Sequence, residues 1–224
     1  MTARNLEHDW FPRPLPENIE LGPNVYIETS YIFSAFFSTR QPGLIMEEGS
    51  GAYGLAWIAT GPRAGVKIGA YTCLNGGGLV SDEAIEIGAH CLFAWGTVVT
   101  DLTTPRPEDI GRRRRALIDI ANDPSRRLRP MADTKPVHIA DNVWVGFDSV
   151  IAGGVSIGRG AVVGSKTVIT ENIPPYAVVV GNPCRIVRYL EPDDSEEARM
   201  AALREFGLAP ALATWPAKGA RAPS

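Results

Sequence analysis

Three histidines, His8, His90 and His138, are the only imidazoles among the 224 residues of the chain. A general base that works near neutral pH is most often a histidine, because its pKa lies close to 7. A zinc site built from three imidazoles would need all three together. His8 stands in an N-terminal segment and His138 is expected to point outward, so we expect no metal site. His90 is left as a candidate base.

The three cysteines, Cys73, Cys91 and Cys184, form neither an even disulfide set nor a CxxC metal motif. We expect them to be structural, with Cys91 at a small inward-facing position. The 22 Lys+Arg and 25 Asp+Glu give a formal net charge of −3, which argues against a nucleic-acid binder. No apolar run approaches the roughly 18–20 residues of a membrane span, and no signal peptide is apparent at the start. We therefore expect a cytoplasmic protein in a reducing setting.

An aliphatic residue recurs every six positions in the second half of the chain. The column consists of Ile139, Val145, Ile151, Ile157, Val163 and Ile169. Four places after each stands a small or β-branched residue: Val143, Ser149, Val155, Ala161, Thr167 and Ile173. The same frame occurs upstream at Ile87, Phe93 and Val99, at Ile68, Leu74 and Val80, and at Leu21, Ile27 and Phe33.

A period of six fits neither a simple strand, with period 2, nor a helix, with period 3.6. It fits a short strand plus a bend, stacked so that successive coils bury one continuous apolar column. A sandwich or barrel is the alternative, but its strands recur at about 8–12 residues with variable turns. The strict register therefore predicts a solenoid.

The segment from Asp141 to Arg188 reads DNVWVGFDSVIAGGVSIGRGAVVGSKTVITENIPPYAVVVGNPCRIVR and resembles the hexapeptide-repeat acyltransferases. It is most similar to galactoside, maltose, xenobiotic and polysaccharide O-acetyltransferases through NVWVG, the double proline and GNPCRIVR. The resemblance implies an all-β fold, a left-handed parallel β-helix of hexapeptide repeats, and a homotrimer with active sites between subunits. It also implies acetyl-CoA as co-substrate and the hydroxyl of a sugar, glycan precursor or similar small molecule as acceptor.

Acetyl transfer to a hydroxyl needs a base, donors for the oxyanion, and a groove with cationic contacts for the CoA phosphates. The resemblance places Trp144 against the pantetheine arm and the backbone of Gly146 and Phe147 near its amides. Further CoA contacts are implied for Ser165, Thr170 and Arg185, and charge alone adds Lys166 and Arg188. Glu171 stands where some relatives carry a basic residue, which departs from the pattern for the adenosine phosphates.

The catalytic base does not follow from the resemblance. Relatives place a histidine where the chain leaves the coil for a long loop, whereas this chain has Thr103 and Thr104 before Pro105. A threonine hydroxyl is not a base at neutral pH. We therefore take His90 and Asp101 as candidate catalytic residues, although a carboxylate needs desolvation to raise its pKa.

The repeat is interrupted in three places. Residues 34–65 keep poor register and read as irregular coils or an insertion, and the frame slips by one residue at Ser81–Glu83. Residues 101–136 form a long inserted loop with eight arginines and a predicted short helix, in which Pro107, Glu108 and Asp109 suit the first turn. The Arg112–Arg115 run is interpreted as a solvated face paired with acids or as a cationic lid over an anionic ligand.

The predicted organisation is an N-terminal arm (1–18), a repeat domain (19–190) and a C-terminal helix with a loose tail (191–224). Ser195 is the expected N-cap of that helix and Gly207 its stop, and the helix is expected to cover the open end of the coils. The arm, with Trp10 and Phe11, is expected to pack on the outside or on a neighbouring subunit.

Three functions compete. The first is an acetyl-CoA-dependent O-acetyltransferase whose acceptor, given the arginines, is anionic. The second is a catalytically silent trimer that binds or scaffolds, because the loop histidine is missing. The third is a γ-type carbonic anhydrase, which the histidine count disfavours.

Overall fold

The computed structural model describes residues 5–11, 13–103, 110–123, 133–193, 195, 197, 198 and 201. The chain divides into two compact units, Met1–Tyr189 and Leu190–Ser224. Every strand of the described residues belongs to the first unit.

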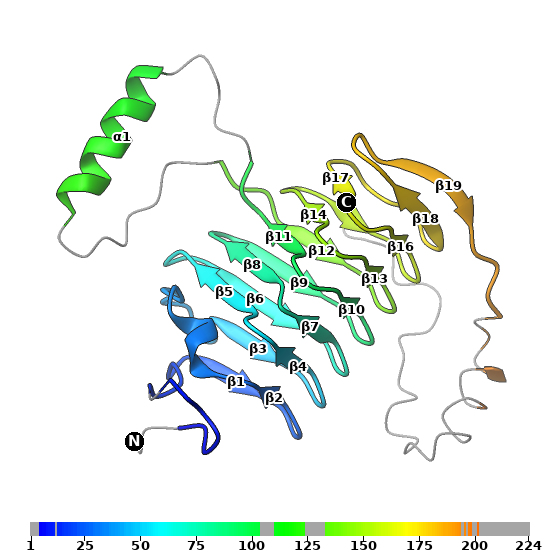
Figure 1. Ribbon diagram of the computed structural model, residues 1–224, viewed down its shortest axis with the longest axis horizontal. Coiled ribbons are helices and arrows are strands. Elements are labelled where there is room, and N and C mark those ends of the chain that lie inside the picture. Colours follow the sequence, from blue (N-terminus) through cyan, green and yellow to red (C-terminus); the bar gives the residue numbers. More distant parts are fainter. Residues whose placement is uncertain are drawn as a thin grey trace. The chain divides into compact units, whose positions relative to one another are not determined.

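The strands of the first unit form three sheets, which the chain visits in turn (Figure 1). The six-stranded sheet contains β1 (Ile19–Leu21), β3 (Leu44–Met46), β6 (Gly65–Ile68), β9 (Ala84–Ile87), β12 (Val137–Ile139) and β15 (Ser156–Ile157). The eight-stranded sheet contains β2 (Tyr26–Ile27), β4 (Gly51–Tyr53), β7 (Cys73–Asn75), β10 (Leu92–Phe93), β13 (Trp144–Val145), β16 (Val162–Val163), β18 (Ala177–Val180) and β19 (Arg185–Tyr189). The five-stranded sheet contains β5 (Trp57–Thr60), β8 (Gly78–Ser81), β11 (Val98–Thr100), β14 (Val150–Ile151) and β17 (Val168–Ile169). All the pairings are parallel except that of β18 with β19, so the chain winds as a three-sided solenoid.

The six-residue column is the core of this solenoid. All six of its members after residue 138 are at most 3% exposed, and the small residues four places later are buried as well. Alternate residues of a strand point to opposite faces, so one aliphatic side chain per strand faces inward and its neighbour faces solvent. The expectation of stacked, single-column coils is confirmed.

The bends between sheets have a repeated backbone geometry. At the first corner, which joins the six-stranded to the eight-stranded sheet, Tyr71, His90 and Asn142 all have positive φ (55°, 57° and 59°). The N–H of each donates to a carbonyl one coil earlier, as His90 does to Ala70 over 2.8 Å. Asn and His enter the left-handed region more readily than β-branched residues do, which explains polar residues at this corner.

The second corner joins the eight-stranded to the five-stranded sheet and contains a ladder of buried hydroxyls. Thr97 Oγ1 donates to the Ala94 carbonyl over 2.8 Å, and Ser149 Oγ donates to the Gly164 carbonyl over 2.9 Å. One coil later, Thr167 Oγ1 accepts from the N–H of Gly181 over 3.0 Å. These bonds satisfy polar groups inside the bend, where an unpaired group would be costly.

One predicted core position is wrong. Val80 is only partly buried, whereas Leu79 is 2% exposed and lies in register with Ile58 and Val99. The bend from Leu74 to Leu79 is one residue short of the repeat. Its glycine-rich sequence allows the tighter path because glycine has no Cβ. The frame therefore slips before Leu79 as well as at Ser81–Glu83.

Residues 34–65 form irregular coils. Their strands β3, β4 and β5 join all three sheets, so the segment is not an insertion outside the solenoid. Ile27 pairs with Ala52, 25 residues later, whereas Ile139 pairs with Ile157, 18 residues later. A short helix, η1 (Ser30–Phe33), replaces a strand in the first coil. The longer bends explain the poor periodicity there.

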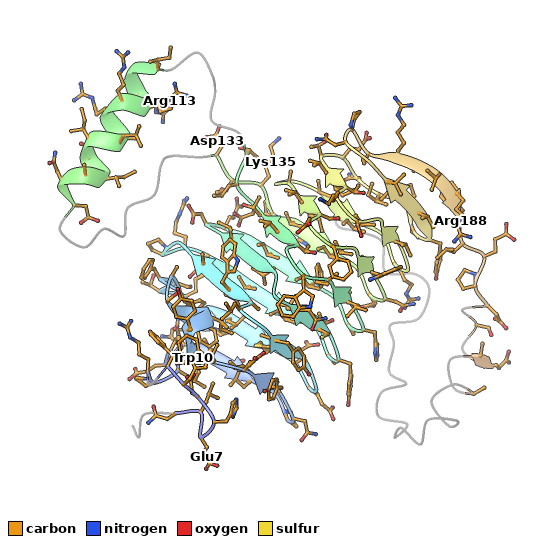
Figure 2. All side chains as sticks on the ribbon, in the orientation of Figure 1. Glu7, Trp10, Arg113, Asp133, Lys135 and Arg188 are labelled. Carbon is orange, nitrogen blue, oxygen red and sulfur yellow. The ribbon has the colours of Figure 1, made fainter. Side chains whose placement is uncertain are left out.

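The third corner joins the five-stranded to the six-stranded sheet, and the inserted segment begins and ends at one place on it. Leu102 and Thr134 form an antiparallel bridge, and the N–H of Thr103 donates to the Asp133 carbonyl over 2.8 Å. Figure 2 labels Asp133 and Lys135 where the chain returns to β12. Within the insert, the predicted helix is confirmed as α1 (Ile110–Asn122), with no buried residue. The proposed first-turn residues Pro107, Glu108 and Asp109 lie outside the described residues.

The N-terminal arm lies against the first coil. The His8 ring stacks on Tyr26 at 5.5 Å, and Trp10 contacts Phe11 and Tyr31. The Asp9 carboxylate accepts hydrogen bonds from Thr29, Ser30 and Phe11. Burial alone would raise the pKa of Asp9, but these bonds together hold that pKa well below its usual value. A carboxylate thus holds the arm against the first coil of the same chain.

In the second unit, the N–H of Ala198 donates to Ser195 Oγ over 3.2 Å, as an N-cap requires. Residues 197, 198 and 201 are helical, which agrees with the predicted start, while Gly207 lies outside the described residues. In the first unit, the antiparallel strand β19 ends the eight-stranded sheet, with a register shift at Val178 and Val179. Such an irregularity disfavours further edge pairing.

Candidate functional site

The expected CoA-binding residues other than Thr170 gather on the eight-stranded sheet and the second corner. Trp144 points outward from β13 with 49% of its surface exposed. It pairs in register with Leu92 of β10, which is 44% exposed, and with Val162 of β16. These outward side chains form an apolar row across consecutive coils, and such a row suits an apolar arm of a ligand.

The second corner continues this surface. Phe147 follows Trp144 around the bend and is 52% exposed, and Trp95 occupies the equivalent place one coil earlier with 54% exposed. The two coils are joined directly, because the N–H of Asp148 donates to the Trp95 carbonyl over 3.0 Å. We name the four residues Leu92, Trp95, Trp144 and Phe147 the apolar patch. Exposed apolar clusters of this kind mark interaction sites.

Backbone groups approach closely beside the apolar patch. A Cβ added to Gly146 would lie 2.7 Å from the Ser165 nitrogen and 2.9 Å from its Oγ, so only glycine fits there. The N–H of Lys166 donates to the Phe147 carbonyl over 2.7 Å. Lys166 Nζ lies 3.9 Å from Asp148, and both side chains are largely exposed. Gly146, Phe147, Ser165 and Lys166 thus form one continuous surface on successive coils.

Two arginines extend the row beyond this point. Arg188 pairs with Val178, which lies in register with Val162 and therefore with Trp144. Arg185 pairs with Val180, at the second-corner end of β18. Both arginine side chains are exposed, and Figure 2 labels Arg188 on β19. The cations of the row therefore stand on coils after Trp144.

Thr170 lies apart from the row, because it follows β17 at the end of the five-stranded sheet. The Cys184 thiol lies beside Thr170 and 3.9 Å from the Glu171 carboxylate. Burial, followed by the charge of Glu171, raises the pKa of this thiol. The loop that precedes Arg185 thus brings Thr170 near the row without placing it on the same sheet.

His90 stands at the first corner and is half-buried. Its ring stacks on Tyr71, with centroids 5.5 Å apart and an angle of 7° between the planes. Burial lowers the pKa of His90, while the charge of Asp141 acts in the opposite direction. The neutral imidazole, which is the form a base requires, is therefore favoured at pH 7.

Asp101 has the contacts of a structural carboxylate. It is completely buried and accepts a hydrogen bond from Ser81 Oγ at 2.7 Å. The N–H groups of Asp82, Glu83 and Ala84 also donate to it. Asp101 thus organises the turn at the third corner, and the structure does not bring it together with His90 at the first. Thr103, at the place of the expected histidine, donates its hydroxyl to the Asp133 carbonyl over 2.8 Å.

The other candidate groups have ordinary surroundings. His138 is exposed on β12 and lies 3.3 Å from Glu86, as expected of an outward residue. Cys91 is 1% exposed, and burial raises the pKa of its thiol to about 11. Among the described residues, no cluster of His, Cys, Asp or Glu could hold a metal ion. No helix in the described part of the chain could cross a membrane.

Leu92 and Trp95 were not identified from the sequence. Both occupy the repeat positions that Trp144 and Phe147 occupy one coil later. The sequence signal was therefore the presence of large apolar residues at the same two outward positions in successive coils. The long insert between those coils hid this relationship.

Comparisons with known proteins agree with this geometry. Residues 136–171 match the family model of the bacterial transferase hexapeptide (six repeats). A protein of Staphylococcus aureus (strain COL) that carries the name acetyltransferase is 45% identical over 58 residues, which are 26% of this chain and 29% of that protein. The galactoside O-acetyltransferase of Lactococcus lactis is 30% identical over 116 residues, 52% of this chain and 48% of that protein. The matched regions thus span less than half the length of these relatives.

A solved structure extends the match. The hexapeptide-repeat acetyltransferase of Vibrio cholerae, in complex with acetyl-CoA, is 26% identical with a TM-score of 0.51 and covers 72% of this chain and 75% of its own. The three-sided solenoid and the repeat define a hexapeptide-repeat protein. Over the matched residues the chain is similar to the hexapeptide-repeat acetyltransferases.

Proposed function

We propose that the protein transfers acetyl from acetyl-CoA to a hydroxyl of a sugar, glycan precursor or similar small molecule. The observation that carries the proposal is the continuous row of Trp144, Gly146, Phe147 and Ser165 with cations at one end. The names of the relatives and the acetyl-CoA complex of the Vibrio cholerae structure support it. In this proposal the pantetheine arm lies along Trp144 and Phe147, and the phosphates of CoA meet Lys166, Arg185 and Arg188.

The proposed solenoid is left-handed, and the proposed assembly is a cytoplasmic homotrimer. The outward faces support self-association. The six-stranded sheet exposes Glu20, Lys67, Glu86 and His138, whereas the eight-stranded sheet and the second corner expose the apolar patch. Burying Trp144 and Phe147 between copies would remove them from water at about 25 cal/mol per Å².

His90 is the proposed base, because the Asp101 carboxylate is occupied by hydrogen bonds within its own turn. In the reaction, the imidazole takes the proton of the acceptor hydroxyl while the hydroxyl oxygen attacks the thioester carbonyl carbon. The carbon–sulfur bond then breaks, and the CoA thiolate recovers the proton from His90. His90 and Trp95 flank the two-residue strand β10, His90 at the first corner and Trp95 at the second. In the proposed trimer, the imidazole that acts beside Trp95 is therefore supplied by a neighbouring subunit.

The second candidate is a silent trimer that binds acetyl-CoA without turning it over. Its specific support is that Thr103 and Asp101, near the usual place of the base, are both held by hydrogen bonds of the insert and its turn. An assay of CoA thiol release over a panel of sugars separates the two. Turnover that is lost in His90→Asn rejects the silent trimer, and saturable binding without any turnover rejects the enzyme.

A further inference from the structure

The positions of the positively charged residues along the row indicate how a bound acetyl-CoA would be oriented. The cations Lys166, Arg185 and Arg188 follow Trp144 in the order of the coils, as the strand register shows. On the coils before Trp144, the corresponding strand positions hold Leu92 and Cys73. If the phosphates bind the cations, the thioester end therefore points toward Leu92 and Trp95.

Trp95 is held flat at this end of the row. A Cβ added to Gly54 would lie 2.5 Å from Trp95 Cη2, and one added to Gly76 would lie 2.3 Å from Trp95 Cε3. The indole thus lies over the backbone of two earlier coils, while 54% of the residue remains exposed. A large aromatic surface that is fixed in place and open to solvent can stack a ligand with little loss of side-chain entropy.

Residues with oxygen acceptors stand next to the glycines Gly54, Gly76 and Gly96, the first two of which the indole covers. The Glu28 carboxylate accepts a hydrogen bond from the N–H of Gly54, and Asn75 ends β7 in register with Tyr53. A Cβ added to Gly96, the residue after Trp95, would meet Asp148 Oδ1. An exposed aromatic face on coils that also carry carboxylate and amide oxygens suits a ring with an apolar face and hydroxyl donors at its edge.

We propose that Trp95 is the platform on which the pyranose ring of the acceptor stacks, beside the thioester end of acetyl-CoA. This inference rests on the proposed function and specifies its acceptor. In the step it serves, a ring hydroxyl loses its proton to the base and forms the ester bond, the carbon–sulfur bond breaks, and CoA leaves as the thiol.

The test is a comparison of Trp95→Ala, Trp95→Phe and Trp10→Ala as full-length proteins. Trp10 is the matched control, since it is 63% exposed and lies in the N-terminal arm. The probes are methyl β-galactopyranoside and methyl α-glucopyranoside as acceptors, with thiol release as the readout. Acetyl-CoA affinity by calorimetry, acetyl-CoA hydrolysis without acceptor, and mass by light scattering are measured in parallel.

For Trp95→Ala we expect a KM for the glycosides about tenfold higher, with acetyl-CoA affinity, hydrolysis and mass unchanged. Trp95→Phe should recover most of the loss, and Trp10→Ala should match the wild type. An unchanged glycoside KM overturns the proposal, as does a Trp95→Ala protein of lower mass, which would make Trp95 an interface residue. Wild-type protein that fails to bind acetyl-CoA overturns the proposed function instead, so the two failures are distinguishable.

Discussion

The N–H of Asp148 donates to the Trp95 carbonyl over 3.0 Å, although 53 positions and the long insert separate the two residues. This bond holds the corner before the insert directly against the corner after it. It places Trp95 beside Phe147, as the strand register places Leu92 beside Trp144. The apolar patch is therefore produced by the coil geometry and needs no contribution from the insert.

The inward and outward faces of β16 offer a matched pair of variants. Val163 is fully buried, whereas its neighbour Val162 is only partly buried. We expect Val163→Ala to lower the free energy of unfolding by about 2 kcal/mol through lost burial and a residual cavity. Val162→Ala should lower it by less than about 1 kcal/mol. Urea unfolding followed by circular dichroism measures both, and equal losses would contradict the assigned faces.

Asp101→Asn should destabilise the turn at the third corner. The amide keeps one acceptor oxygen but places an NH₂ group against backbone N–H donors, so we expect a loss of about 1–3 kcal/mol in the free energy of unfolding. Asp148→Asn is the control, because its carboxylate is mostly exposed, and should change stability by less than about 0.5 kcal/mol. If Asp101→Asn proves as stable as the control and yet inactive, Asp101 belongs to the catalytic groups after all.

His90 predicts a pH dependence of stability. Burial, opposed by Asp141, lowers its pKa below the ordinary 6.5, so the unfolded chain binds the proton more tightly. The contribution of His90 is thus fully present above pH 6.5 and is lost as the pH falls through the lowered pKa. His90→Asn keeps a residue that tolerates positive φ and removes the titration. We expect the wild type to lose more stability than His90→Asn between pH 7.5 and 5; parallel curves would be inconsistent with a buried neutral imidazole.

The proposed contacts of Arg185 and Arg188 with the CoA phosphates can be tested with a truncated acetyl donor. Arg185→Gln and Arg188→Gln should each weaken acetyl-CoA binding several-fold, about 3–10, because each removes a charge-assisted contact to phosphate. Binding of acetyl-pantetheine, which lacks the nucleotide and its phosphates, should not change. Arg63→Gln, an exposed residue of another turn, serves as control. Equal weakening of acetyl-CoA and acetyl-pantetheine binding would show that the two arginines do not contact the phosphates.

The arginine run of α1 is tested with acceptors that differ by one carboxylate. If Arg112–Arg115 contact an anionic acceptor, replacing all four with Gln should raise the KM for galacturonic acid by about tenfold and leave that for galactose unchanged. Acetyl-CoA affinity should also stay constant. An equal change for both sugars, or no change for either, would favour the interpretation of α1 as a solvated helix.

The regular part of the fold follows from the sequence because one residue per hexapeptide must be buried, and Ile139 to Ile169 satisfy that rule without exception. The position of Leu79 does not follow, because a bend of consecutive glycines can shorten without leaving a pattern in the apolar residues. Trp144 and Phe147 are recognisable from a resemblance, whereas Trp95 emerges only when the coils are stacked across the insert. Asp101 is a candidate from the sequence that the structure assigns to another role. Its carboxylate stands near the expected position of the base, but all of its contacts are hydrogen bonds within a turn.

Calorimetric titration with acetyl-CoA tests the central claim most directly. We expect saturable binding at one site per subunit, a clear loss of affinity in Trp144→Ala, and wild-type affinity in the control Trp10→Ala. Binding should also raise the melting temperature, because a ligand of the folded state stabilises it by mass action. No heat and no thermal shift at millimolar acetyl-CoA would contradict the account.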